Sequence, residues 1–327
     1  MVRDLRMFTI YGLLLLVVLG GVLAVGIAGR KGIPLGPAPA EASRTGKVIS
    51  LSLAAEEIII GLDGPERLAA VTGLALDPRF SNVAVEAARV GRAVSGTSIE
   101  RIVRLGPELV IVAPYTDSAA RSALERYGIR LLPLKDFDGI RAIQEGIGTI
   151  GKALQLEARA AALVEDMDRR IAGAGARLHA GQRRPRVLRY DPADPWVAGS
   201  GTVIDDVIRL AGGTNVAAEN GVSGTRSVRK ETVARWNPEV LLVEGEPAAR
   251  RAIEERLQGD AVFQGVTAIH RLSTGAAGAP GLVVLPTRTL TAVSQFAAEA
   301  VERLSAELFP MGAPYAANGA GAPQEGR

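Results

Sequence analysis

The sequence contains no cysteine and only two histidines, His179 and His270. The absence of cysteine excludes disulfide bonds, thiolate metal ligands, a cysteine nucleophile and an anchor built on a lipid-modified cysteine. Two histidines are too few for a zinc site with three histidine ligands, and tight capture of bare zinc or manganese is not expected. We therefore predict no metal site made of protein ligands and no resident cofactor.

Most of the chain also lacks an excess of positive or negative charge. The net charge of +3 is carried by residues 1–31, which hold four basic residues and one acidic residue, and the remainder is balanced. Aromatic residues make up only 4% of the sequence and do not alternate with basic runs. Nucleic-acid-binding proteins show the opposite pattern, so no nucleic-acid partner is expected.

Motifs for nucleotide binding and catalysis are incomplete or missing. Residues 146–153 approximate a phosphate-binding loop, but they lack the Ser or Thr that would reach magnesium, and no strand precedes them. Their isoleucines recur on one helical face, which favours core packing. No Gly-x-Ser-x-Gly elbow occurs, and no nucleophile stands beside a base and an orienting group. We assign no catalytic residue and expect a protein that is not an enzyme.

The longest hydrophobic run lies at residues 13–28. With the residues before it, this run can cover the roughly 20 residues that a bilayer requires. It exceeds the apolar part of a signal peptide, which is about 7–15 residues long. Residues 1–31 are predicted to be an uncleaved signal anchor, with a cleaved signal peptide as the alternative, so that the body lies outside the cytoplasm at the membrane. Residues 32–45 indicate a flexible linker and residues 311–327 a disordered tail.

An internal repeat divides the body of the chain. Residues 100–112 align with residues 231–243 at an offset of 131, with identical Glu, Arg, Pro, Glu and Val at five of thirteen positions. Each copy is typical of a short helix, a turn before proline and a buried strand. A repeat at this distance predicts two similar lobes, because a solenoid would have a far shorter period.

Strands and helices are predicted to alternate in both halves, which indicates an α/β fold with a mainly parallel sheet in each lobe. The predicted strands are 48–53, 109–113, 130–134, 186–190, 240–243 and 269–272, and the predicted helices are 54–62, 118–127, 203–211, 248–257 and 290–308. An unbroken helical pattern follows Leu156. The resulting division is an N-terminal lobe over 46–153, one long interlobe helix over 154–182 and a C-terminal lobe over 183–310.

With these pieces the chain resembles the helical-backbone class of ABC-importer binding proteins, which includes cobalamin-, iron–siderophore- and haem-binding members. The most specific similarity is in residues 98–102 and 106–110, which follow the Val90-Gly91 pair. The resemblance extends over about residues 46–308. It implies two α/β lobes bridged by one long helix, a ligand held between them, and delivery to an ABC permease with its ATPase.

The same resemblance implies that one glutamate on each lobe docks onto the permease. The matching positions are Glu100 and Glu231, which the internal repeat superposes. Residues 97–100 also fit a capping box, in which Glu100 would only cap its own helix. The equivalent glutamate in the second lobe favours docking over capping.

By resemblance the ligand lies at strand ends, and the candidate ligand-binding residues there are Tyr115, Tyr190, Trp196 and Arg288. Aromatic walls suit a large planar or apolar ligand, and arginine suits carboxylates or catecholates. Haem-binding members tend to carry a tyrosine soon after the Val-Gly pair, where residues 92–95 are Arg-Ala-Val-Ser here. An iron(III)–siderophore is the first expectation, with cobalamin or haem as alternatives. The rival class is a membrane-anchored enzyme or metal-cluster scaffold on the same architecture.

Overall fold

A computed structural model describes residues 48–179, 182–191, 193–274 and 280–310. The chain divides into two units, residues 1–44 and 45–327, and every described residue belongs to the second. The predicted signal anchor, linker and tail all lie outside the described residues. No helix within the described ranges combines the length and the apolar character needed to cross a membrane.

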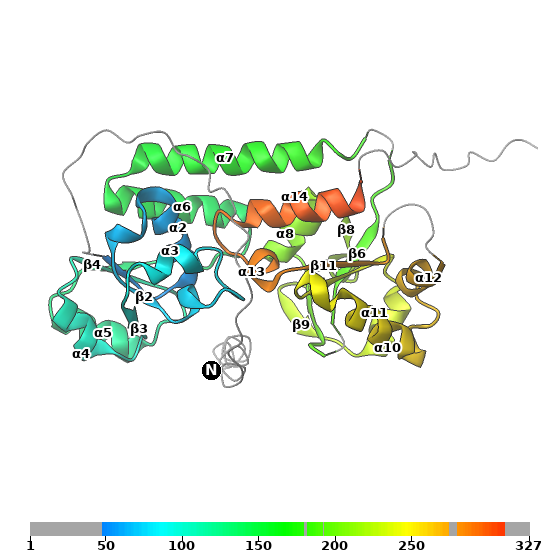
Figure 1. Ribbon diagram of the computed structural model, residues 1–327, viewed down its shortest axis with the longest axis horizontal. Helices are drawn as coiled ribbons and strands as arrows, with labels where there is room; N and C mark the ends of the chain where they lie inside the picture. Colours follow the sequence, from blue (N-terminus) through cyan, green and yellow to red (C-terminus); the bar gives the residue numbers. More distant parts are fainter. Residues whose placement is uncertain (1–47, 180–181, 192, 275–279, 311–327) are drawn as a thin grey trace, which may run out of the picture. The chain divides into compact units, whose positions relative to one another are not determined.

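The first lobe is built on a five-stranded parallel sheet in the order β3-β2-β1-β4-β5 (Figure 1). Every residue of β1 and β4 is buried, as expected for parallel strands that are covered on both faces. The chain leaves β1 toward β2 and β3 on one side and continues through β4 and β5 on the other. The strands are β1 (Val48–Ser50), β2 (Leu68–Thr72), β3 (Ala93–Val94), β4 (Leu109–Val112) and β5 (Leu131–Pro133).

The second lobe repeats this plan with a four-stranded parallel sheet in the order β11-β10-β6-β8. Two further strands, β7 and β9, form a separate antiparallel pair. The strand order reverses between β1 and β4 in the first sheet and between β6 and β10 in the second. The strands are β6 (Arg186–Arg189), β7 (Trp196–Ala198), β8 (Thr214–Asn215), β9 (Thr225–Ser227), β10 (Val240–Glu244) and β11 (Leu282–Leu285).

Helices cover both faces of the sheets. Those of the first lobe are α2 (Leu53–Asp63), α3 (Ala84–Ala88), α4 (Ile99–Leu105), α5 (Ser118–Arg126) and α6 (Ile140–Leu154). Those of the second lobe are α8 (Val203–Leu210), α9 (Val216–Glu219), α10 (Lys230–Trp236), α11 (Arg250–Gly259), α12 (Thr267–Thr274), α13 (Thr287–Leu290) and α14 (Ala297–Leu308). The α/β class with two similar lobes is confirmed.

The two copies of the sequence repeat adopt the same structure. Helices α4 and α10 each contain seven residues, and each bears one fully buried side chain at the same repeat position, Ile102 or Val233. Each helix ends on a left-handed residue, Gly106 (φ 59°) or Asn237 (φ 47°), before its strand begins. Glycine and asparagine tolerate this conformation best, which explains the exchange of one for the other at this position.

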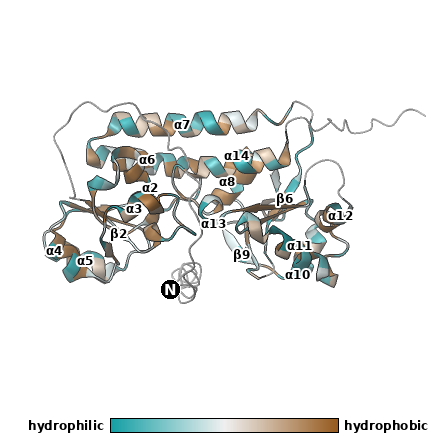
Figure 2. Cartoon of the chain, viewed as in Figure 1, coloured by the Kyte–Doolittle hydropathy of each residue, from teal (hydrophilic) through white to brown (hydrophobic). Residues whose placement is uncertain are grey.

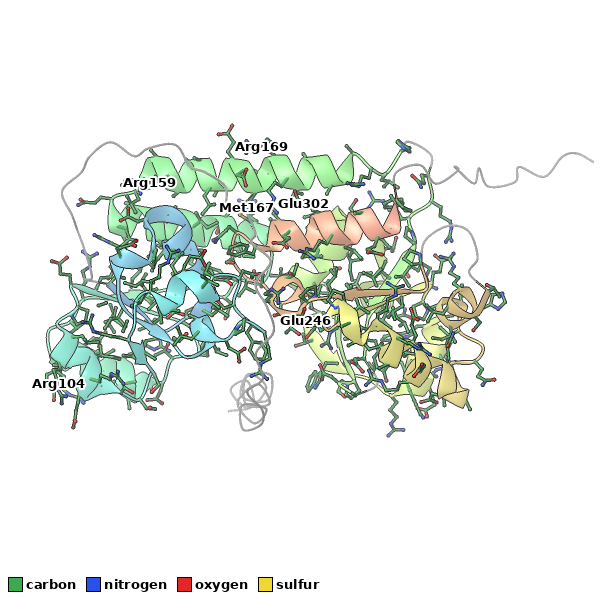
Figure 3. All side chains as sticks on the ribbon, in the orientation of Figure 1. Arg104, Arg159, Met167, Arg169, Glu246 and Glu302 are labelled. Atoms are coloured by element: carbon green, nitrogen blue, oxygen red, sulfur yellow. The ribbon has the colours of Figure 1, made fainter. Side chains whose placement is uncertain are left out.

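Helix α7 (Glu157–Gly175) joins the lobes, and it packs on α6 and α2 of the first and on α14 and α8 of the second. It is shorter than the predicted range 154–182 at both ends. Gln155 adopts a left-handed φ of 61° that ends α6 and delays the start of α7, and the last residue of α7 is Gly175. Its residues are a mixture of hydrophilic and hydrophobic types (Figure 2). Buried side chains recur every seven residues, at Ala160, Met167 and Ala174. Figure 3 shows Met167 pointing toward the helices beneath it and Arg169 pointing away from them.

Two ion pairs fasten α7 to the two lobes. Arg159 contacts Asp63 of α2 at 2.6 Å, and Arg170 contacts Glu302 of α14 at 2.5 Å. These pairs are partly exposed, and such pairs typically contribute only about 0–1 kcal/mol each. The apolar packing of α7 on α6 and α14 therefore does more to hold the helix in place.

Two predicted elements are wrong. Residues 269–272, predicted as a strand, lie in helix α12, and the edge strand of the sheet is β11. Ile269 and Leu272 both pack on the second-lobe core at a helical spacing of three, which a four-residue window does not separate from a strand. The predicted closing helix over 290–308 begins only at Ala297, after the separate short helix α13. Residues 146–153 lie inside α6 as core packing predicts.

Glycines of α6 provide a test of the packing between α6 and α7. A Cβ added at Gly151 would lie 2.4 Å from the Cβ of Ala160 on α7, whereas one added at the exposed Gly148 would meet nothing within 4 Å. We expect Gly151→Ala to destabilise the protein by roughly 1–3 kcal/mol through overpacking. Gly148→Ala should stabilise it by about 0.5–1 kcal/mol by reducing backbone entropy. Chemical denaturation of both variants checks this, and equal effects at the two positions would contradict the close helix contact.

Candidate ligand-binding site

The first lobe presents Tyr115 just beyond the carboxyl end of β4. Ligands of open parallel sheets bind at this edge, where the strand order reverses. Although Tyr115 is 45% exposed, its hydroxyl group is enclosed by protein and bonded to Ser52, which follows β1. Burial raises the pKa of Tyr115, the Ser52 hydrogen bond opposes this, and the charge of Glu56 adds to it. Tyr115 therefore offers an aromatic surface and a neutral phenol.

Glu56 lies close to Tyr115 and is completely buried in α2. Its carboxyl group accepts hydrogen bonds from the backbone nitrogen of Thr72 at 2.5 Å and from the Thr72 hydroxyl at 2.7 Å. Burial raises the pKa of Glu56 from 4.5 to about 8, although the Thr72 hydrogen bonds act in the opposite direction. Glu56 therefore holds a proton at neutral pH.

The next residue, Glu57, joins the two lobes. Its carboxylate accepts hydrogen bonds from the backbone and side-chain nitrogens of Asn82, at 2.8 and 3.0 Å, and from the hydroxyl of Ser294. The side chain of Gln295 donates to the backbone oxygen of Glu57 at 2.7 Å. Ser294 and Gln295 precede α14 of the second lobe. Burial raises the pKa of Glu57, and these hydrogen bonds oppose the shift.

Arg288, a predicted ligand residue, lies at the same junction, just beyond β11. Its Nη1 donates to Glu246 Oε1 at 2.9 Å and to the carbonyl oxygen of Pro78 at 3.2 Å, so it links the second lobe to the first. Its own carbonyl oxygen accepts a hydrogen bond from Asn82 at 2.7 Å. The Arg288 side chain is 24% exposed. Its role in ligand binding stays a prediction.

A buried arginine lies at the carboxyl ends of β6 and β10, where the strand order of the second sheet reverses. Arg189, the last residue of β6, donates to Glu244 at the end of β10, with the nearer contact at 2.7 Å. It also donates to Asp194 at 2.7 Å and to the carbonyl oxygen of Trp196 at 2.6 Å. The network fixes the start of β7 against the sheet edge, and with it the half-buried Trp196.

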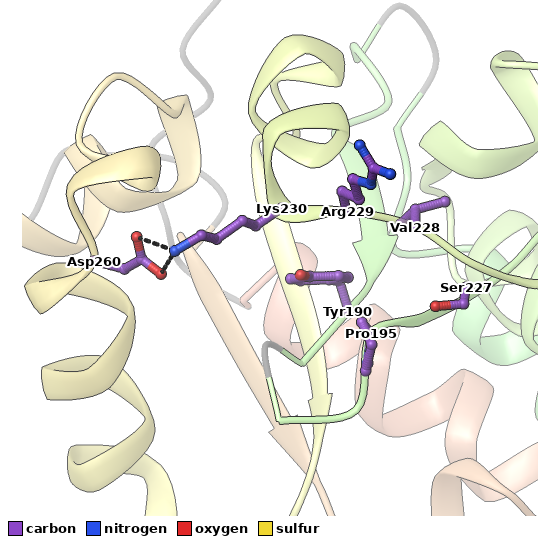
Figure 4. A pocket seen from close by; sticks show the side chains of 7 residues that line it. All are labelled: Tyr190, Pro195, Ser227, Val228, Arg229, Lys230 and Asp260. Atoms are coloured by element: carbon purple, nitrogen blue, oxygen red, sulfur yellow. Dashed lines mark hydrogen bonds and ion pairs between the residues drawn. The ribbon is translucent and has the colours of Figure 1, made fainter.

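Tyr190 directly follows β6 and is only 2% exposed, with its ring edge-on to Phe263 at a centroid distance of 6.0 Å. Its ring thus belongs to the core of the second lobe. The Tyr190 side chain also borders a pocket of about 580 Å³, drawn in Figure 4. The pocket is lined by Tyr190, Pro195, Ser227, Val228, Arg229, Lys230 and Asp260, all of the second lobe. Of the predicted ligand residues, Tyr190 and Trp196 belong to the second lobe, Tyr115 belongs to the first, and Arg288 lies at the junction.

The two predicted docking glutamates occupy the second positions of α4 and α10 and are both exposed. Within the described part of the chain, neither Glu100 nor Glu231 makes a hydrogen bond or an ion pair. The residue that precedes α4 as its N-cap is Ser98 and not Thr97, and its side chain makes no capping bond, so the capping box of residues 97–100 is not formed. Figure 1 shows α4 and α10 on the side of this unit opposite α7.

Sequence reasoning did not identify Glu56, Glu57, Asn82 or Arg189 as parts of this edge. A signal was available for the first two, since two adjacent carboxylates interrupt an otherwise apolar helix. Asn82 and Arg189 carry no comparable signal, because their partners Arg288 and Glu244 are distant in the sequence.

Comparison with known proteins extends these observations. The model of the periplasmic binding protein family matches residues 48–271. A cobalamin-binding protein from Halobacterium salinarum is 31% identical over 150 residues, which are 45% of this chain and 40% of that protein. The chain therefore spans less than half the length of this curated relative.

Solved structures share the fold at lower identity. The periplasmic haem-binding protein HutB of Vibrio cholerae has a TM-score of 0.68 and 19% identity, covering 81% of this chain and 99% of that protein. The periplasmic haem-binding protein RhuT from Roseiflexus sp. RS-1 has a TM-score of 0.66 and 22% identity, covering 81% and 98%. The predicted resemblance and fold class are confirmed.

The raised pKa of Glu56 makes a testable contribution to stability. Between pH 4.5 and about 8 the folded protein binds the Glu56 proton more tightly than the unfolded chain does. This contribution is therefore complete below pH 4.5 and is lost as the pH rises through about 8. Glu56→Gln, which imitates the protonated acid, should gain stability relative to the unchanged protein as the pH rises across this window. Thermal unfolding at several pH values measures the effect, with Glu100→Gln as the exposed control, and parallel curves for Glu56→Gln and the unchanged protein would refute it.

Proposed function

Because this chain belongs to the periplasmic binding protein family, we propose that it is the solute-binding component of an ABC importer. It holds a metal chelate between its lobes on the extracytoplasmic side and delivers it to a permease driven by an ATPase. The apolar run at residues 13–28 supports a tether to the membrane on that side. The chain contributes recognition, and it carries out no chemical reaction on the chelate.

The pair Glu100 and Glu231 is the observation that carries this proposal. The two carboxylates lie at the same position of equivalent helices, one on each lobe, and both are exposed. Two separated anionic points of this kind can fix the orientation of a flat partner that carries two cationic groups. Charges at an interface chiefly set the encounter rate and the register of the partners.

Among chelates we place a cobalamin-type corrinoid first. The 31% identity to a cobalamin-binding protein supports this choice. Tyr115 also supports it, because its 45% exposed ring can provide an aromatic wall for a macrocycle. An iron(III)–siderophore is the second candidate, because Arg288 would recognise its acidic groups. It ranks lower because the Arg288 guanidinium already contacts Glu246.

Docking is tested by removing both glutamates. Because each carboxylate is exposed and unpaired within the described residues, Glu100→Ala/Glu231→Ala should leave the melting temperature and the chelate affinity nearly unchanged. Uptake in cells that depend on this importer should be abolished, since interface charges of this kind can cost about 2–5 kcal/mol when truncated. A matched variant, Arg104→Ala/Arg235→Ala on the same two helices, serves as the control. Normal uptake by the glutamate variant would contradict docking, and lost chelate binding would relocate these residues to the ligand site.

Ligand capture is tested by tryptophan fluorescence. The chain has two tryptophans, Trp196 near the strand ends and Trp236 packed against the second-lobe core. Cyanocobalamin should quench the emission, and Trp196→Phe should lose most of that response while Trp236→Phe keeps it. A ferric catecholate siderophore added in the same assay compares the two candidates. Full quenching in Trp196→Phe would exclude this residue as a wall of the site.

A further inference from the structure

Helices α6 and α7 border a groove of about 520 Å³, and its lining residues come only from these two helices. Along α7 the lining residues recur at intervals of three and four from Glu157 to Asp168, so they form one face of that helix. Along α6 they are Gly148 and Lys152, which are one helical turn apart on the same face. The groove is therefore a straight channel between two helix faces, separate from the strand edges.

The middle of the groove is open and apolar. Gly148 has no side chain there, and a Cβ added to it would meet nothing within 4 Å. The facing residues of α7 are the small Ala161 and the half-buried Val164. At one end the side chain of Gln144, one turn before Gly148, donates a hydrogen bond of 2.6 Å to Asp168 and so links the two helices. This middle section suits a narrow aliphatic chain.

The ends of the groove are acidic. Glu157 lies at one end, and Glu165 and Asp168 lie at the other, so the lining holds three carboxylates against the single ammonium group of Lys152. Glu157 and Glu165 are exposed, and neither makes a hydrogen bond or an ion pair with another residue in the described ranges. Eight residues separate them, which corresponds to about 12 Å along a helix that rises 1.5 Å per residue.

We propose that this groove binds a linear aliphatic amine with a cationic nitrogen at each end, a diamine or a polyamine. One ammonium group contacts Glu157, the other contacts Glu165 and Asp168, and the methylene chain lies on Ala161 and Val164. Ammonium groups form strong charge-assisted hydrogen bonds with carboxylates, and the apolar floor favours methylene groups over a more polar ligand. Helix α7 is opposite α4 and α10 (Figure 1), so the site does not depend on chelate capture or on docking.

Three ligands that differ in charge and length test the proposal by isothermal titration calorimetry of the full chain at pH 7 and low ionic strength. Diaminooctane has an amine at each end of a long chain, diaminobutane has the same charge on a short chain, and octanediol has the long chain without charge. We expect diaminooctane to bind at least about fivefold more tightly than diaminobutane, because only the long chain reaches both acidic ends and covers the apolar floor. Octanediol should show no measurable binding.

Four variants locate the site. Glu157→Gln and Glu165→Gln should each weaken diaminooctane about threefold to fivefold, as expected for the loss of one exposed ion pair. Lys152→Gln should bind it more tightly, because the competing cation is removed from the groove. Gly148→Leu should abolish binding, since the new side chain occupies the middle of the groove without meeting the backbone.

Each type of change has a matched control outside the groove. Glu145→Gln removes an exposed carboxylate of α6, and Gly173→Leu adds bulk at an exposed glycine of α7 where an added Cβ also meets nothing within 4 Å. Both should bind diaminooctane as the unchanged protein does, and thermal unfolding verifies that every variant is folded. Absence of binding, equal affinity for the two diamines, unaltered binding in Gly148→Leu, or equal losses in Glu145→Gln and Glu157→Gln would overturn the proposal.

Discussion

The arrangement of the lobes depends on a carboxylate buried where they meet. Glu57 extends from a helix of the first lobe and is contacted by Asn82 of the same lobe and by Ser294 and Gln295 of the second. A buried carboxyl group that lost these hydrogen bonds would cost several kcal/mol, so moving the segment before α14 away from Glu57 would destabilise the protein. Helix α7 adds a second connection through apolar packing on both lobes. These contacts hold the strand edges of the two lobes in position relative to each other without a disulfide bond.

Although the lobes share a plan, their strand edges differ in chemistry. The first edge is neutral, with the Tyr115 phenol, hydroxyl groups and the protonated Glu56. The second is charged, with Arg189 held among Glu244 and Asp194. A ligand between such walls meets an aromatic surface on one side and fixed polar groups on the other. This asymmetry suits a large chelate that has an apolar body and a polar periphery.

The proposed docking surface keeps a symmetry that the two strand edges lack. Helices α4 and α10 are set by the same local pattern, a seven-residue helix that ends on a left-handed Gly106 or Asn237. Their glutamates are therefore presented in the same way on both lobes. The neighbouring residues differ, and in the second lobe they form the pocket around Tyr190.

The sequence alone determined the features that are encoded locally. The repeat at residues 100–112 and 231–243 predicted two lobes, because helix, turn and strand are specified within thirteen residues. The same periodicity predicted α6 and most of the strands. Tertiary structure decided what depends on distant partners: the burial of Glu56, the junction at Glu57 and Asn82, and the engagement of Arg288 with Glu246. It also decided that residues 269–272 are helical, since a short apolar run takes its conformation from the surface that it packs against.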